Sequence, residues 1–205
     1  DEWAKVGDAV IASCSTTLPQ ILSRPETSKE VVSKVVRLIL LFIERDLISK
    51  DTQVLKLLVD TLINALDKSN SENYFSLTVA TKTDILTAIC GLLVKLNITQ
   101  YEDVKTIYEI VARSFKMYAD IGLRDALVNI VCAIGNHLEH FVVVGDLLRG
   151  LNANNTSRMG EPDFEKRMES FAKLNEVEYS QLDAVQWLPL VHACLFFIND
   201  EEFSI

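Results

Sequence analysis

The chain has 205 residues, of which 49% are hydrophobic and 24% are charged, so it can bury a large core and is not disordered as a whole. Glycine and proline number only seven and four, and this scarcity of turn residues favours helices over strands. The formal charge is −9, and from residue 161 onward ten acidic residues stand against three basic ones. A phosphate-binding surface needs clustered Lys and Arg, and the sequence shows no such cluster. The chain is therefore not expected to bind nucleic acid directly.

The first half of the chain predicts four helices, because apolar residues recur there at three- and four-residue steps. We expect them over residues 3–22, 29–46, 52–66 and 76–96, with a polar loop at 69–75. The Val and Ile content of the second segment would also suit a strand, but its length and the spacing of its charges favour a helix. The expected start or cap residues are Thr27 or Ser28 for the second helix, Asp51-Thr52 for the third and Thr83 or Asp84 for the fourth.

The second half predicts a clear helix from Val104 to Ala119, a turn at 120–122 and a partner helix from Leu123 to about His140. A short helix over 141–148 follows. Residues 150–160 have no periodicity and are rich in Asn, Ser and Gly, so we interpret them as a mobile surface loop or the scar of an insertion. Glu161 and Pro162 are expected to start the next helix. The last expected helix follows Ser180.

This pattern predicts an all-α fold, namely a fragment of a HEAT/armadillo-like helical solenoid made of antiparallel helix pairs. Leu18-Pro19 and Leu188-Pro189 both lie inside apolar helices, where a proline is expected to bend the helix around its partner. We expect degenerate HEAT-like repeats over 1–149, the loop or insertion over 150–160, and further HEAT-like helices over 161–205. The last residues stop as another helix begins, which is typical of a piece cut from a longer chain. A plain helical bundle remains the alternative architecture.

Two histidines invite a metal hypothesis, because His137 and His140 lie three residues apart with Glu139 between them. The alternative is a pair of polar residues at a helix end, and we favour it because no third and fourth ligands are apparent. His192 stands alone on an apolar helix and is expected to be a core or groove histidine. With no glycine-rich phosphate loop and no Gly-x-Ser-x-Gly elbow, the sequence predicts no enzyme, no cofactor and no metal.

The cysteines Cys14, Cys90, Cys132 and Cys194 are far apart, and each lies in an apolar helical pattern. No pair has the spacing of a zinc site, so we expect buried, reduced thiols in an intracellular protein. The longest apolar run, 38–43, is far too short to span a bilayer, and we predict no membrane partner.

The stretch from Trp187 to Ile205 holds an apolar helix, a proline after its first turn and an acidic corner. Its aromatic residues are candidates either for a peptide-binding patch or for packing between repeats, and packing is the commoner case. The acidic corner is expected to be a solvated turn rather than an acid/base pair. The candidate interaction or repeat-packing residues are Trp187, Pro189, Phe196, Phe197, Asp200, Glu201 and Glu202.

A wider pattern surrounds this stretch. It consists of Asp163-Phe164-Glu165-Lys166-Arg167, Phe171-Ala172-Lys173-Leu174-Asn175, Trp187-Leu188-Pro189-Leu190 and Cys194-Leu195-Phe196-Phe197-Ile198. It resembles a segment of the U3 small nucleolar RNA-associated protein 20 family, very large HEAT-repeat components of the small-subunit processome. The resemblance covers about the last fifth of the chain, and residues 1–160 carry no motif that matches.

The resemblance implies a nucleolar or nuclear, non-catalytic scaffold that acts in ribosome biogenesis, during processing of the 18S precursor RNA. Its implied partners are other ribosome assembly factors, with pre-ribosomal RNA bound through other parts of the full-length protein, and no small-molecule substrate. Another HEAT-type adaptor, such as a nuclear transport receptor or a phosphatase-type scaffold, is the alternative, because the Leu-Pro-Leu and acidic-corner pattern occurs in many of them.

Overall fold

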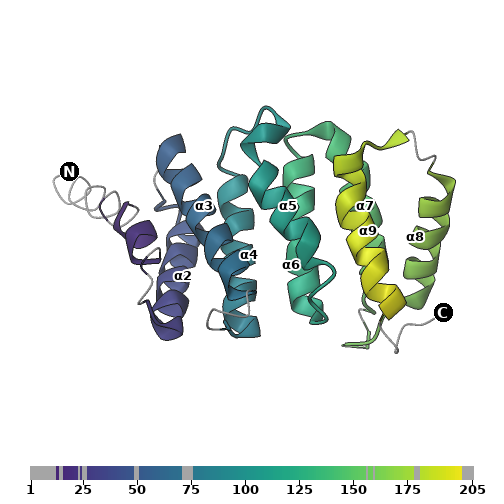
Figure 1. Cartoon of the computed structure of the whole chain (residues 1–205), viewed down its shortest axis with the longest axis horizontal. Coiled ribbons are helices and arrows are strands. Elements are labelled where there is room, and N and C mark those ends of the chain that lie inside the picture. Colours follow the sequence, from purple (N-terminus) through teal and green to yellow (C-terminus); the bar gives the residue numbers. More distant parts are fainter. Residues whose placement is uncertain are drawn as a thin grey trace. The chain divides into compact units, whose positions relative to one another are not determined.

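The computed structural model describes residues 13, 16–22, 24, 27–48, 51–70, 76–155, 157–158, 160–177 and 181–199. Within these ranges every regular element is a helix (Figure 1), and the β-type pairing is limited to an isolated bridge between Asn154 and Pro162. The predicted all-α fold is therefore confirmed. By its contacts the chain divides into two compact units, Asp1–Asn97 and Ile98–Ile205. The boundaries expected at 149/150 and 160/161 stay predictions.

The first unit is built around one central helix. Helices α2 (Lys29–Glu44) and α3 (Thr52–Ser69) both pack against α4 (Val79–Leu93). The chain comes close to itself at Gly91, where an added Cβ would lie 2.9 Å from Cγ2 of Ile43. An alanine there would force the Ile43 side chain to shift. Fully buried side chains of this core include Val36, Ile39, Leu58, Leu62, Ile85 and Ile89.

Of the helices α2, α3 and α4 in this unit, two begin at the residues expected to cap them. Ser28 caps α2 by accepting a hydrogen bond from Val31 N, and Asp51 caps α3 by accepting from Gln53 N at 2.8 Å. The expected start of α4 at Thr83 or Asp84 is wrong. Thr78 is the cap, because its Oγ1 accepts from Thr81 N at 3.2 Å, and the helix begins one turn earlier.

The second unit contains five α-helices among its described residues, with one short 3-10 helix before the first of them and another between the second and the third. In chain order its elements are η1 (Tyr101–Asp103), α5 (Lys105–Ser114), α6 (Ile121–Gly135), η2 (Glu139–Phe141), α7 (Val142–Leu151), α8 (Phe164–Glu176) and α9 (Ala184–Asn199). The helix expected to run to Ala119 ends at Ser114. The turn expected at 120–122 already belongs to α6, because Asp120 Oδ1 accepts a hydrogen bond from Leu123 N at 3.0 Å and caps that helix.

The packing order in this unit differs from the chain order. Helices α6, α7 and α8 pack on one another in succession, but α9 returns to pack against α5 and α7. In Figure 1 the yellow ribbon of α9 runs in front of α7, whereas α8 lies at the edge of the unit. The last described helix therefore completes the core that α5 begins. Regular HEAT-type pairing of successive helices stays a prediction.

The connection between α7 and α8 is closed by backbone hydrogen bonds. Asn155 N donates to Glu161 O at 2.8 Å, and Asp163 N donates to Ala153 O at 3.0 Å. The expected helix start at Glu161 and Pro162 is wrong, because both precede Asp163, whose carboxylate caps α8 by accepting from Lys166 N at 3.2 Å. The mobility expected of 150–160 stays a prediction.

Candidate functional site

The start of α9 is fixed by a reciprocal pair of side-chain hydrogen bonds. The Asp183 carboxylate accepts from the backbone N of Val185 and of Gln186, both at 2.8 Å, while Gln186 Oε1 accepts from Asp183 N at 2.8 Å. This is a capping-box arrangement. The Gln186 amide also donates to the His140 carbonyl and so attaches α9 to η2. Asp183 and Gln186 were not among the sequence candidates, although their three-residue spacing was a readable signal.

Trp187 and Pro189 lie in the first half of α9. Trp187 is half-buried and Pro189 is buried within the helix. Proline has no backbone N–H, so it cannot donate to the Val185 carbonyl four residues earlier. This part of α9 therefore depends on side-chain packing more than a regular helix does.

Phe196 and Phe197 lie near the end of α9 and meet two arginines from other helices. The Arg124 guanidinium, from α6, lies 4.0 Å from the Phe196 ring centroid and 5.0 Å from that of Phe197. The Arg167 guanidinium, from α8, lies 5.5 Å from the Phe197 centroid. We call these four residues the arginine–phenylalanine cluster. It links α6, α8 and α9, and Phe197 is only 8% exposed.

Hydrogen bonds hold both guanidinium groups in place. Arg124 donates to the carbonyls of Phe115 at 2.8 Å and Tyr118 at 2.9 Å, and to the Asn152 side-chain oxygen at 2.6 Å. Arg167 donates to the Ala153 carbonyl at 2.9 Å. Both arginines are below 10% exposed, so their charges are compensated by oriented carbonyls and ring faces.

Sequence reasoning did not single out Arg124, Arg167 or Asn152. A signal was present for Arg124, since it shares a helix face with Leu127, Val128 and Val131 at the +3, +4 and +7 positions. Asp200, Glu201 and Glu202 lie outside the described residues. Whether the α9 candidates bind a partner or only pack stays a prediction.

The histidines and cysteines are dispersed. His137 is in the turn after α6 and His140 is in η2, and the described residues contain no group of three or more His, Cys, Asp or Glu side chains placed to hold a metal ion. His192 is half-buried on α9, and burial together with the charges of Lys116 and Arg113 lowers its pKa. This arrangement favours a neutral imidazole.

Cys90, Cys132 and Cys194 are half-buried and form no disulfide within the described part of the chain, while Cys14 lies outside the described residues. Burial raises the pKa of Cys132 and of Cys194. Cys132 Sγ accepts a hydrogen bond from Arg149 at 3.0 Å, which acts in the opposite direction on its pKa. Because the raised pKa favours the thiol over the thiolate, neither cysteine has the character of a nucleophile.

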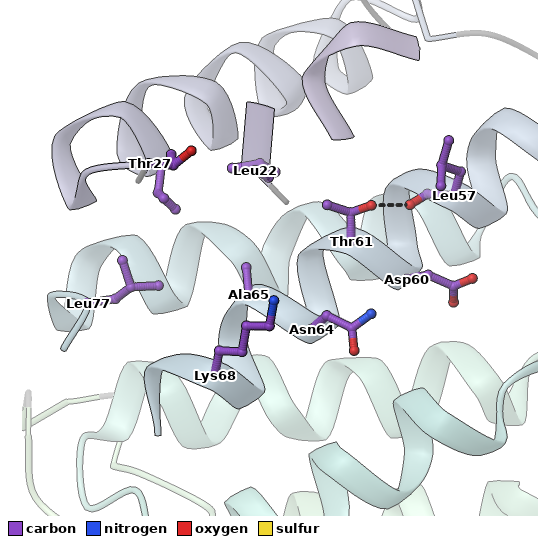
Figure 2. A pocket seen from close by; sticks show the side chains of 10 residues that line it. Leu22, Thr27, Leu57, Asp60, Thr61, Asn64, Ala65, Lys68 and Leu77 are labelled. Carbon is purple, nitrogen blue, oxygen red and sulfur yellow. Dashed lines mark hydrogen bonds between the residues drawn. The ribbon is translucent and has the colours of Figure 1, made fainter. Parts of the chain in front are cut away.

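The first unit carries a groove of about 460 Å³ along α3 (Figure 2). Polar side chains of α3 line one part of it. Apolar side chains from α3, from α2 and from the segments that precede α2 and α4 line the rest. The lining residues are Leu22, Thr27, Val32, Leu57, Asp60, Thr61, Asn64, Ala65, Lys68 and Leu77. Thr61 Oγ1 donates to the Leu57 carbonyl at 2.7 Å and Thr27 Oγ1 to the Ile21 carbonyl at 2.6 Å, so both hydroxyls are already bonded to the backbone.

Packed helices, a buried arginine–phenylalanine cluster and a surface groove define the described part of the chain as an all-α protein made of stacked helices. Among its described helices, none has the length and apolar character needed to cross a membrane.

Comparisons with known proteins identify the family. The family model described as "U3 small nucleolar RNA-associated protein 20, N-terminal" matches residues 4–205, and the chain belongs to that family. The match extends well beyond 164–205, where sequence reasoning found its motifs.

Two curated relatives carry the name U3 small nucleolar RNA-associated protein 20. The one from Saccharomyces cerevisiae is 26% identical over 205 residues, covering 98% of this chain and 8% of the yeast protein. The one from Schizosaccharomyces pombe is 27% identical over 127 residues, covering 59% of this chain and 5% of that protein. The chain thus spans less than a tenth of the length of these relatives. No solved structure matches it significantly.

Proposed function

We propose that the chain is part of a non-catalytic scaffold in small-subunit ribosome biogenesis, which acts in the nucleolus during processing of the 18S precursor RNA. The observation that carries this proposal is the family match over residues 4–205, together with two relatives named for association with the U3 small nucleolar RNA. The proposed partners are other components of the small-subunit processome, with pre-ribosomal RNA bound through other parts of the protein.

The proposed mechanism is surface display by a rigid, HEAT-like stack of helices. The arginine–phenylalanine cluster supports it, because its two buried, hydrogen-bonded guanidinium groups on α6 and α8 lie against the Phe196 and Phe197 rings of α9. Exposed apolar side chains also support it, since Phe164 and Met168 lie one turn apart on α8 and are 55% and 50% exposed. Exposed apolar surface of this kind is typical of sites that bind other proteins.

The α9 candidates take two roles in this proposal. Pro189, Phe196 and Phe197 pack inside the second unit, whereas the half-buried Trp187 presents its remaining surface to a partner.

The proposal is tested by capturing a tagged form of the protein from cells and measuring what comes with it. We expect enrichment of U3 RNA, of precursor 18S RNA and of small-subunit assembly factors over an untagged control. Deleting residues 98–205 from the tagged protein is expected to reduce at least one assembly factor. Recovery of Ran and transport cargo without U3 RNA would instead favour the nuclear transport alternative and contradict the proposal.

A further inference from the structure

The groove along α3 combines apolar walls with a row of polar side chains. Asp60, Asn64 and Lys68 lie four residues apart, so each lies about one turn further along α3 than the one before and is rotated by about 40° around the helix axis (Figure 2). The groove volume of about 460 Å³ lies within the range of ligand-binding pockets. The apolar side chains beside the row are Leu22, Val32, Leu57, Ala65 and Leu77.

The polar groups of this row are available to a ligand. Within the described part of the chain, no side-chain hydrogen bond or ion pair engages Asp60, Asn64 or Lys68. Burial raises the pKa of the Asp60 carboxyl, and the charge of Lys56 acts in the opposite direction. A cation placed opposite Asp60 would make a favourable charge interaction with its carboxylate.

The spacing of the row matches an extended peptide. Eight residues of α-helix advance about 12 Å, which is close to the roughly 13 Å spanned by four residues of an extended chain. Side chains two and four residues apart in an extended chain lie on the same face. The first, third and fifth residues of a peptide can thus face Asp60, the middle of the groove and Lys68.

We propose that this groove binds an extended peptide of a partner protein, in which a basic residue pairs with Asp60, an apolar residue two positions away fills the groove, and an acidic residue two positions further pairs with Lys68. The Asn64 amide then donates to and accepts from the peptide backbone. This inference rests on the proposed scaffold function and deepens it by naming a surface and a class of partner. Single-stranded RNA does not fit, because its phosphates would face the Asp60 carboxylate.

The test measures binding of labelled nine-residue peptides to the 205-residue chain by fluorescence anisotropy. The mixed-charge peptides have the core sequence Lys-Thr-Leu-Thr-Glu or its reverse, because a peptide could bind along the row in either direction. Two further peptides carry either two acidic residues or two lysines at the charged positions. We expect the mixed-charge peptides to bind best to the wild-type chain. Asp60→Lys should weaken them about tenfold or more and favour the peptide with two acids, and Lys68→Glu should favour the peptide with two lysines.

Asp67→Lys is the matched control, because it makes the same charge change on an exposed residue of α3 that does not line the groove. It should leave the order of preference unchanged. Circular dichroism verifies that each variant is folded. Three outcomes would each overturn the inference. They are absence of peptide binding by the folded wild-type chain, unchanged peptide preferences in both groove variants, and displacement of the peptide by a nine-nucleotide RNA.

The two proposals fail in distinguishable ways. If the tagged protein retains U3 RNA but the peptides do not bind, the groove inference is wrong and the scaffold function stands. If the tagged protein captures no U3 RNA while the charge variants still switch peptide preference, the groove is a peptide site and the proposed function is wrong.

Discussion

The guanidinium of Arg124 lies over the ring of Phe196, with its Cζ 4.0 Å from the ring centroid. Arg124 belongs to α6 and is 5% exposed, whereas Phe196 comes from the last described helix. The positive charge in the core is stabilised by the Phe115 and Tyr118 carbonyls, the Asn152 amide oxygen and the ring faces. This pair therefore joins two helices that are distant in the chain through polar as well as apolar contacts.

Replacing Arg124 with Ala should lower the free energy of unfolding by about 2–4 kcal/mol, because buried carbonyls lose their donors and a cavity remains under Phe196. Arg124→Lys should recover only part of this loss, since an ammonium cannot reproduce the planar fork of the guanidinium. Urea unfolding followed by circular dichroism measures both. The control is Arg158→Ala, which removes an exposed ion pair with Glu161 and should change stability by less than about 0.5 kcal/mol. An equally small effect for Arg124→Ala would contradict the role assigned to the cluster.

Tyr108→Phe should leave stability unchanged or raise it by up to about 1 kcal/mol. The Tyr108 ring is fully buried, 4.8 Å from the Phe141 ring between centroids, and no hydrogen-bond partner for its hydroxyl exists in the described part of the chain. Phenylalanine keeps the ring contacts and removes the unsatisfied hydroxyl. Thermal unfolding of this variant and of Tyr108→Leu, which loses the ring and should be clearly destabilised, gives the comparison. A large loss for Tyr108→Phe would show that the hydroxyl is bonded.

Gly150→Ala should destabilise the second unit by about 1–3 kcal/mol, because an added Cβ would lie 1.7 Å from Ser170 Oγ and 2.8 Å from its Cβ. Adding Ser170→Gly should remove the clash and leave mainly the helix cost of glycine, about 1 kcal/mol. A double-mutant cycle on unfolding free energies measures this coupling. Strictly additive effects would mean that α7 and α8 do not approach so closely.

The pH dependence of stability should include a contribution from His192. Burial, Lys116 and Arg113 lower its pKa in the folded state, so the unfolded chain takes up a proton more readily. The stability associated with the neutral imidazole is present above the unfolded pKa of about 6.5 and is lost as pH falls through the lower folded pKa.

Titration of the His192 ring protons by NMR is expected to give a pKa below the ordinary value, and Lys116→Gln should raise it. Lys105→Gln is the control, because Lys105 lies at the start of α5 and is not among the charges that act on His192. A pKa that stays the same in Lys116→Gln would contradict the electrostatic account, and an unshifted wild-type value would contradict burial as its cause.

Much of the secondary structure could be predicted from the sequence, because it depends on local rules. Apolar spacing located the helices, and Ser28 and Asp51 were readable as caps. The start of α4 was missed because Thr78, Thr83 and Asp84 are all residue types that cap helices. Only the fold decides which of them lies next to the unbonded N–H groups of the first helical turn. Pro162 was misread for a similar reason, since the hydrogen bonds that close the loop place Asp163 at the helix start.

The arginine–phenylalanine cluster was out of reach of the same reasoning. From the sequence alone, an arginine is expected to lie on the surface, because charged side chains are seldom buried. Only the return of α9 over α5 and α7 brings Phe196 and Phe197 to Arg124, and that return is a tertiary choice without a local signal. The α3 groove likewise depends on segments that precede α2 and α4, so its polar row looked like an ordinary solvated helix face.

The return of α9 has a consequence for synthesis of the chain on the ribosome. Helix α5 ends at Ser114 and α9 begins only at Ala184. The face of α5 that α9 covers therefore stays uncovered until α9 has been synthesised. At 5–20 residues per second this interval lasts roughly 4–14 s, much longer than a helix needs to form. During that time the nascent α5 surface is open to chaperones or to incorrect neighbours, and the second unit can close only after α9 has been made.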